Sequence, residues 1–311
     1  MRGRYAPSPT GQLHFGNLRT ALLAWLFARS TGGQFVLRME DLDQPRARLG
    51  VAEQQLEDLH WLGLEWDEGP DVGGPYGPYV QSDRKRIYEA ELARLRHEDL
   101  VYPCYCTRAE LSRVGSAPHG EDTPVYPGTC RDLDERARRR LEDAGRRTAL
   151  RFRAPTAPIS FTDRIGGPVE ENVAASVGDF VVRRSDGIVA YQFAVVVDDA
   201  LMGITQVVRG WDLLSSTPRQ LALFQALGYE APREFAHVPL ALETSGTRMA
   251  KRFGSAGIAQ VLAGAIGPAQ VLGALASSCG LWPEGVPATL TELLATFAAE
   301  RIDPRPSSVR L

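Results

Sequence analysis

Apolar residues follow two patterns along the chain, and each pattern predicts a different secondary structure. Short, mostly apolar runs predict β-strands near 2–6, 34–39, 179–183, 192–198, 205–209 and 235–238. Segments with an apolar face at helical spacing predict helices near 17–29, 50–62, 83–97, 214–227, 256–263 and 268–278. Because strands and helices alternate, we expect an α/β protein with a parallel sheet and with ligands at the carboxyl ends of its strands.

The middle of the chain breaks this alternation. Residues 103–176 are rich in Pro, Gly and Arg, so we expect an inserted subdomain there. The insertion would split the α/β domain into 1–102 and 177–255 and leave a helical region at 256–311.

Composition is that of a globular protein, with 44% hydrophobic and 23% charged residues. The chain shows neither an apolar run of about 18 residues nor a signal-peptide pattern, so we expect a cytoplasmic protein without a membrane partner. A net charge of −3 gives no general nucleic-acid signature. A local basic stretch at 131–153 has nine Arg against five acids, which fits either phosphate contacts or a solvated helix with ion pairs.

The segment from Arg4 to Asn17 reads RYAPSPTGQLHFGN and carries the first candidate chemistry. Its Pro and Gly residues predict a turn between a strand and a helix. Arg4 precedes that turn, and His14 and Asn17 lie where the helix begins. The exposed N–H groups of a helix N-terminus favour anions such as phosphate.

This segment resembles the nucleotide-binding signature of the class I aminoacyl-tRNA synthetases, in its glutamyl form. The resemblance implies a Rossmann-like catalytic domain in which His14 and Asn17 bind ATP and stabilise its phosphates while an adenylate forms. Magnesium would accompany the ATP.

A second motif at Arg248–Arg252, RMAKR, resembles a degenerate form of the mobile Lys-Met-Ser-Lys-Ser loop of the same family. The chain has only two lysines, Lys85 and Lys251. The resemblance assigns Lys251 to the ATP phosphates, where a closing loop brings it.

Three further segments resemble the glutamate site of the family. The segment RMED at 38–41 implies that Glu40 binds the substrate ammonium group. Tyr191 matches a Tyr that touches glutamate, at the start of an apolar run that we expect to be a strand ending in Asp198 and Asp199. Arg209 in VVRGWD matches an Arg that binds a substrate carboxylate. The complete predicted glutamate site is Arg4, Tyr5, Ala6, Pro7, Ser8, Glu40, Tyr191 and Arg209.

Three cysteines in the middle segment predict one structural zinc ion. Cys104, Cys106 and Cys130 supply three thiolates, and the fourth ligand is either His119 or Tyr126. Ordinary zinc chemistry favours His119. The sequence YPGTCR around Cys130 instead resembles a short branch of the family, the glutamyl-queuosine tRNA(Asp) synthetases, whose zinc is held by three Cys and a Tyr. On that resemblance we expect Tyr126.

The same branch predicts the function. About 60 residues follow Lys251, too few for a usual anticodon-binding domain, and Leu213 stands where ordinary glutamyl enzymes carry His. The resemblance implies that glutamate is activated with ATP and transferred to queuosine at the wobble position of tRNA(Asp). Two alternatives stay open: a truncated ordinary glutamyl-tRNA synthetase that charges a 3′ end, and a non-catalytic paralogue that binds tRNA. We expect a monomer.

Overall fold

The computed structural model describes residues 1–311 except 44–47, 49, 108, 112–124, 243–265 and 309–311. A mostly parallel sheet forms the centre of the molecule, in the order β2-β1-β8-β9-β5-β6. Its strands are β1 (Arg2–Tyr5), β2 (Gln34–Leu37), β8 (Gln206–Gly210), β9 (Glu234–Val238), β5 (Ile159–Asp163) and β6 (Gly167–Glu171). All neighbours are parallel except the hairpin β5–β6. The predicted α/β class is confirmed.

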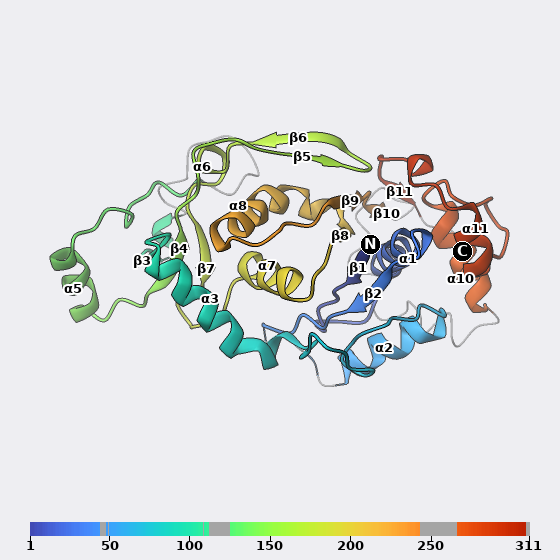
Figure 1. Ribbon diagram of the computed structural model, residues 1–311, viewed down its shortest axis with the longest axis horizontal. Coiled ribbons are helices and arrows are strands. Elements are labelled where there is room, and N and C mark those ends of the chain that lie inside the picture. The colour runs from blue at the N-terminus through green and yellow to red at the C-terminus, as the bar shows by residue number, and fades with distance from the viewer. Residues whose placement is uncertain (44–47, 49, 108, 112–124, 243–265, 309–311) are drawn as a thin grey trace.

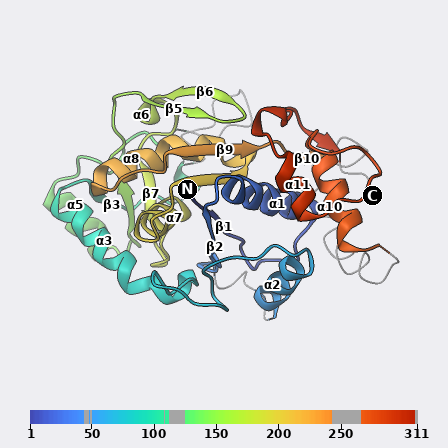
Figure 2. The same cartoon turned by 45° about the vertical axis from the view of Figure 1, so that its right-hand side comes forward.

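Alternating residues of the strands face two different cores. On one face, Phe35, Leu37 and Val208 pack against α1 (Phe15–Ser30), with α10 (Pro268–Ser277) and α11 (Leu290–Thr296) behind it. On the other face, Val36 and Val207 pack with residues that follow α7 (Tyr191–Leu201). Figures 1 and 2 show α1 between the strands and the C-terminal helices.

A smaller antiparallel sheet lies apart from the large one. It consists of β3 (Val101–Cys104), β4 (Ala149–Phe152) and β7 (Phe180–Arg183). The strand expected at 179–183 therefore exists, but it pairs with β4 rather than with the parallel sheet. Around it lie α3 (Lys85–His97), α5 (Glu135–Asp143), α6 (Val173–Ser176) and α8 (Thr217–Leu227).

The remaining elements are short or peripheral. They are α2 (Val51–Trp61), β10 (Ala241–Leu242), β11 (Ser307–Ser308), and 3₁₀ turns at Gln81–Arg84, Trp211–Ser216 and Ala299–Arg301. The predicted helix at 256–263 lies outside the described residues. None of the described helices combines the length and apolar character needed to cross a membrane.

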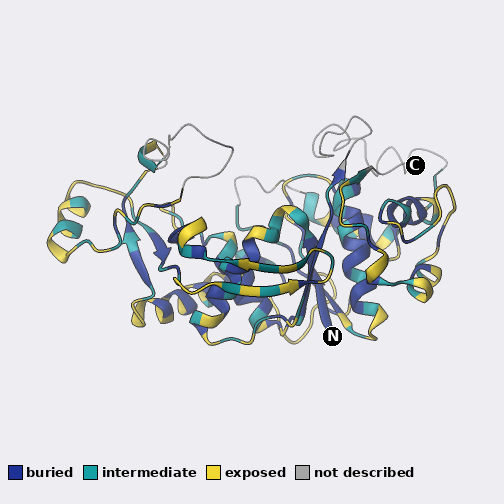
Figure 3. Cartoon of the chain, turned by 90° about the horizontal axis from the view of Figure 1, so that it is seen from above, coloured by how far each residue is buried: buried dark blue, intermediate teal, exposed yellow. Residues whose placement is uncertain are grey.

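The strand expected at 192–198 is wrong, because these residues belong to helix α7. The run from Phe193 to Val197 is buried without interruption, and a continuous apolar run has no periodicity that could distinguish a buried strand from a buried helix. Figure 3 shows how deeply the centre of the molecule is buried. Asp198 and Asp199 lie in the last turn of this helix and are buried with it.

The hairpin β5–β6 comes from the segment expected to form an insertion, yet it extends the large sheet by pairing with β9 (Figure 1). These two strands were not predicted, because the Pro- and Gly-rich sequence of this segment shows no regular spacing of apolar residues. The domain boundaries at 103 and 176 stay a prediction.

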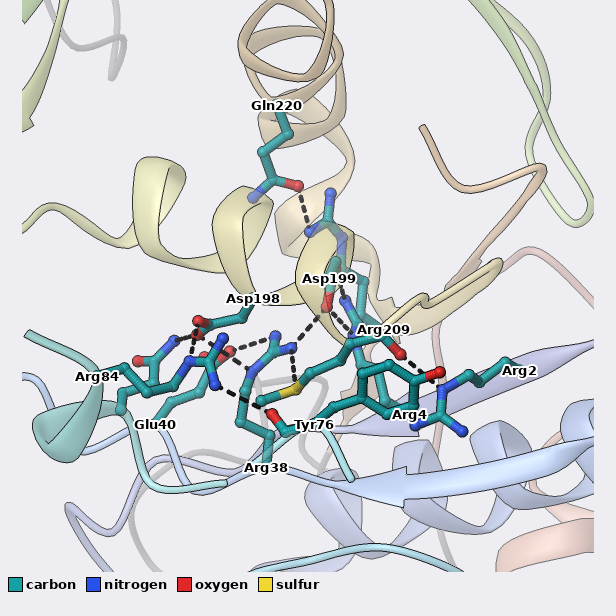
Figure 4. Close-up of polar contacts among 12 residues, drawn as sticks. Arg2, Arg4, Arg38, Glu40, Tyr76, Arg84, Asp198, Asp199, Arg209 and Gln220 are labelled. Carbon is teal, nitrogen blue, oxygen red and sulfur yellow. Dashed lines mark hydrogen bonds and ion pairs between the residues drawn. The ribbon is translucent and has the colours of Figure 1, made fainter. Parts of the chain in front are cut away.

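A cluster of buried charges joins α7 to the ends of the strands. Arg38, which follows β2, has no exposed surface, and it lies between Glu40 and Asp199 (Figure 4). Asp198 accepts hydrogen bonds from Arg84 Nε at 2.6 Å and Tyr88 Oη at 2.9 Å. Buried arginines need such partners, because an unpaired charge in the protein interior is strongly disfavoured.

Replacing Asp198 by Asn should lower the free energy of unfolding by about 3–5 kcal/mol, since Arg38 and Arg84 would keep their buried charge and lose a carboxylate. Urea unfolding measures this loss. The control is Asp186→Asn, because Asp186 pairs with Arg184 while both side chains are 38–40% exposed. That change should cost at most about 1 kcal/mol. Equal losses in the two variants would contradict this account.

Candidate active site

The carboxyl ends of β1 and β8 open into a cavity of about 1080 Å³. Every described residue of the predicted ATP and glutamate sites lines this cavity: Arg4, Tyr5, Ala6, Pro7, Ser8, His14, Asn17, Glu40, Tyr191 and Arg209. Lys251 lies outside the described residues. Segments far apart in the sequence thus meet at one edge of the sheet, as expected for parallel strands.

His14 and Asn17 form the N-terminal cap of α1. The Asn17 N–H donates to His14 Nδ1 at 3.3 Å, and Asn17 Oδ1 accepts from the His14 N–H at 3.2 Å. Because Nδ1 accepts, the proton of the neutral ring is on Nε2. A Cβ at Gly16 would lie only 3.0 Å from His14 Cε1, so the absence of a side chain at Gly16 leaves room for the imidazole ring. The cap fixes both side chains beside the helix N-terminus.

Two side chains of opposite charge share the buried floor of the cavity. Arg4 donates to both oxygens of Asp199, at 3.2 and 3.3 Å. Glu40 accepts from Arg38 Nη2 at 3.0 Å. Burial raises the pKa of Glu40 above its ordinary value, and Arg38 and Arg4 offset part of that rise. Burial also acts to raise the pKa of Asp199, but Arg4 and Arg38 hold it below its ordinary value.

Arg209 and Tyr191 form another wall. Tyr191 is the first residue of α7 and is 36% exposed, whereas Arg209 is only 5% exposed. Arg209 donates from Nη1 to Gln220 Oε1 at 2.7 Å (Figure 4). It also donates from Nη2 to Thr217 Oγ1 at 2.7 Å. These contacts use one N–H on each terminal nitrogen, so each keeps a second N–H.

Sequence reasoning missed the group behind Arg209. His237 on β9 is fully buried, and its Nε2 lies 3.0 Å from Arg209 Nε. Its Nδ1 lies 2.6 Å from Asp163 Oδ2 at the end of β5. In the sequence His237 is a polar residue within a predicted strand, whereas Asp163 lies in a stretch for which no strand was expected, and neither pattern shows that the two residues are neighbours.

The three cysteines of the predicted metal site come together between β3 and the segment before α5. The sulfurs of Cys104, Cys106 and Cys130 all lie within 4.8 Å of one another. Tyr126 Oη is 3.5 Å from Cys104 Sγ and accepts from the Cys130 N–H at 2.9 Å. His119 lies outside the described residues.

These distances fit a tetrahedral zinc site. With Zn–S bonds of about 2.3 Å, two sulfurs of a tetrahedron lie about 3.8 Å apart, and Cys106 Sγ is 3.6 Å from Cys130 Sγ. Arg151 Nε also donates to Cys104 Sγ at 3.2 Å, which favours a thiolate at that position.

Comparisons with known proteins agree with this geometry. The profile of the family "tRNA synthetases class I (E and Q), catalytic domain" matches residues 1–270. The chain belongs to this family of class I tRNA synthetases.

Within the family, the chain groups with the glutamyl-Q tRNA(Asp) synthetases. It is 53% identical to the Glutamyl-Q tRNA(Asp) synthetase of Symbiobacterium thermophilum, over 98% of this chain and 94% of that relative. It is 49% identical to the protein of the same name from Nitratidesulfovibrio vulgaris, with the same coverage of 98% and 94%. The crystal structure of a glutamate tRNA ligase from Elizabethkingia meningosepticum in complex with its amino acid superposes with a TM-score of 0.85 at 30% identity, covering 100% of this chain and 67% of that one.

The buried His237 should make stability depend on pH. Burial lowers the pKa of His237 below its ordinary value, with Arg209 acting in the same direction and Asp163 against it. The unfolded chain, with an ordinary histidine pKa of about 6.5, then binds more protons, so stability falls as pH falls through that value. Between pH 7.5 and 5.5 the wild type should lose up to about 1.4 kcal/mol more than His237→Gln. Urea unfolding at both pH values measures this difference, and an identical pH dependence would contradict a neutral buried His237.

Proposed function

We propose that this protein activates glutamate with ATP and transfers the glutamyl group to queuosine at the wobble position of tRNA(Asp). The observation that carries the proposal is one cavity in which Glu40, whose side chain is 8% exposed, and the buried Arg4 and Arg209 meet the capped N-terminus of α1. Near-complete length agreement with relatives named Glutamyl-Q tRNA(Asp) synthetase supports the same acceptor. A truncated ordinary synthetase and a non-catalytic paralogue are not favoured.

The cavity offers a partner for each charge of glutamate. Glu40 would bind the ammonium group, while Arg4 and Arg209 would bind carboxylates. Tyr191 and the segment Tyr5–Ser8 would complete the pocket around the amino acid.

The walls at the start of α1 would bind ATP. His14 and Asn17 would hold the phosphates beside the helix N-terminus, together with Lys251 and a magnesium ion. A glutamate carboxylate oxygen would attack the α-phosphorus, and the bond to pyrophosphate would break. A hydroxyl of the cyclopentene diol of queuosine would then attack the glutamyl carbonyl, and AMP would leave.

The basic stretch 131–153 supports a nucleic-acid partner. Arg139 pairs with Glu135 and Arg146 with Glu110, so part of the stretch forms ion pairs. Arg136, Arg140 and Arg147 are exposed and form no ion pair with other described residues. We propose that these three contact tRNA phosphates.

The acceptor can be identified with two matched tRNA substrates. Radiolabelled glutamate should be incorporated into queuosine-containing tRNA(Asp), and equally when its 3′-terminal adenosine lacks both ribose hydroxyls. It should not be incorporated into tRNA(Asp) that has guanosine at the wobble position. Incorporation that requires the 3′ hydroxyls and not queuosine would contradict the proposed acceptor and favour an ordinary synthetase.

We further propose that Cys104, Cys106, Cys130 and Tyr126 hold one structural zinc ion per chain. The ion would join strand β3 to the segment before α5, and thiolate ligands of this kind add folding free energy.

Metal analysis of the purified protein should find one zinc per chain, and Cys106→Ser should lose it. Cys279→Ser is the control, because Cys279 is buried in the core with α1 and α10 rather than in this cluster. Tyr126→Phe should bind zinc more weakly, whereas His119→Ala should retain it. Zinc loss in His119→Ala with full occupancy in Tyr126→Phe would contradict the ligand set.

A further inference from the structure

We propose that Asp163 and His237 are positioning residues that orient Arg209 and leave its charge available to a substrate carboxylate. The inference rests on the proposed function, because it concerns the glutamate pocket. It assigns a role to the hairpin β5–β6, which lies in the middle segment of the chain and pairs with β9 (Figure 1).

The positions of the protons shared by Arg209, His237 and Asp163 follow from the fact that a guanidinium can only donate. A guanidinium only donates, so His237 Nε2, 3.0 Å from Arg209 Nε, must accept. The ring proton is therefore on Nδ1 and is donated to Asp163 Oδ2 at 2.6 Å. Asp163 fixes the tautomer of the imidazole, and the imidazole fixes Arg209.

Asp163 is itself held rigidly. Its Oδ1 accepts from the N–H groups of Ile165 and Gly166, at 3.0 and 2.8 Å, within the turn of the hairpin. The backbone N–H of His237 also donates to the carboxylate, at 3.1 Å from Oδ2. The turn, the acid and the imidazole thus form one rigid support for the guanidinium.

Arg4 and Arg209, the two arginines assigned to glutamate, are held in chemically different ways. Arg4 forms a direct ion pair with Asp199. Arg209 donates to neutral acceptors, which include His237, Thr217 and Gln220, and it forms no ion pair with any described carboxylate. A neutral imidazole separates it from Asp163.

This difference has a consequence for specificity. A direct carboxylate partner would offset the charge of Arg209 and weaken its attraction for a substrate carboxylate, which in a buried site is strong. A neutral support orients the guanidinium without that cost. We infer that Arg209 provides the stronger discrimination between a carboxylate and an uncharged amide at the same position.

Two substitutions of His237 separate its hydrogen bond to Arg209 from its hydrogen bond to Asp163. In His237→Gln the amide oxygen can reach the place of Nε2 and accept from Arg209. In His237→Asn the amide lies at the place of Nδ1, keeps a donor for Asp163 and leaves Arg209 Nε without its acceptor. The two variants carry the same amide group and differ by one methylene, so each is the control for which of the two partners, Arg209 or Asp163, keeps its hydrogen bond.

The readout is ATP–pyrophosphate exchange with the full chain, with glutamate and ATP varied separately. His237→Asn should raise the KM for glutamate at least tenfold and the KM for ATP less than twofold. His237→Gln should raise the KM for glutamate less than threefold. A merely structural role would lower the active fraction in both variants without separating the two KM values, and that result would overturn the proposal.

A substitution on α8 tests directly whether the uncompensated charge of Arg209 matters, and it leaves His237 unchanged. Gln220→Glu keeps the side-chain shape and places a carboxylate at Arg209 Nη1, where the amide oxygen now accepts at 2.7 Å. It should raise the glutamate KM at least tenfold and lower the preference for glutamate over glutamine. An unchanged glutamate KM and preference would overturn the proposal. Absence of glutamate-dependent exchange in the wild type would instead show that the proposed function itself is wrong.

Discussion

Buried ion pairing between α7 and the strand ends is the constraint on which the rest of the site depends. Arg38 is fully buried beside the cavity and needs carboxylates close by. Helix α7 supplies them at its last turn, with Asp199 2.7 Å from Arg38 Nη1 and Asp198 3.6 Å from its Nε. Because Asp199 also binds Arg4, and Arg38 also binds Glu40, one cluster sets the positions of both charged groups on the cavity floor (Figure 4).

The buried arginine in the remaining wall of the cavity, Arg209, is stabilised in a different way. Arg209 is nearly as buried as Arg4, but neutral acceptors surround it. An acid is still present in the form of Asp163, one imidazole further away. The site therefore combines an arginine whose charge is largely compensated with one whose charge is left for a ligand, a division that suits a substrate with two carboxylates.

Much of this site could be predicted from the sequence, because its residues lie in short local motifs. The turn before α1, the acid after β2 and the arginine of β8 each lie at or just after the carboxyl end of a recognisable strand, and parallel strands bring these ends together. The three cysteines could be predicted from their spacing and number. The roles of all these residues stay predictions, and Lys251 and His119, the alternative zinc ligand, lie outside the described residues.

The errors have physical causes of two kinds. Residues 192–198 were expected to be a strand because a fully buried helix and a fully buried strand present the same unbroken apolar run. The pairing of Asp163 with His237 was missed because 74 residues separate them and the contact exists only through the pairing of β5 with β9. Neither strand pairing nor the partner of a buried polar residue is encoded in a local pattern.

Glutamate-dependent ATP–pyrophosphate exchange in the absence of any tRNA tests the central claim most directly. The cavity brings Glu40, Arg4 and Arg209 together with the capped N-terminus of α1, all within this chain. The account predicts exchange with glutamate and little or none with aspartate or glutamine. No exchange with glutamate, with or without tRNA, would contradict it.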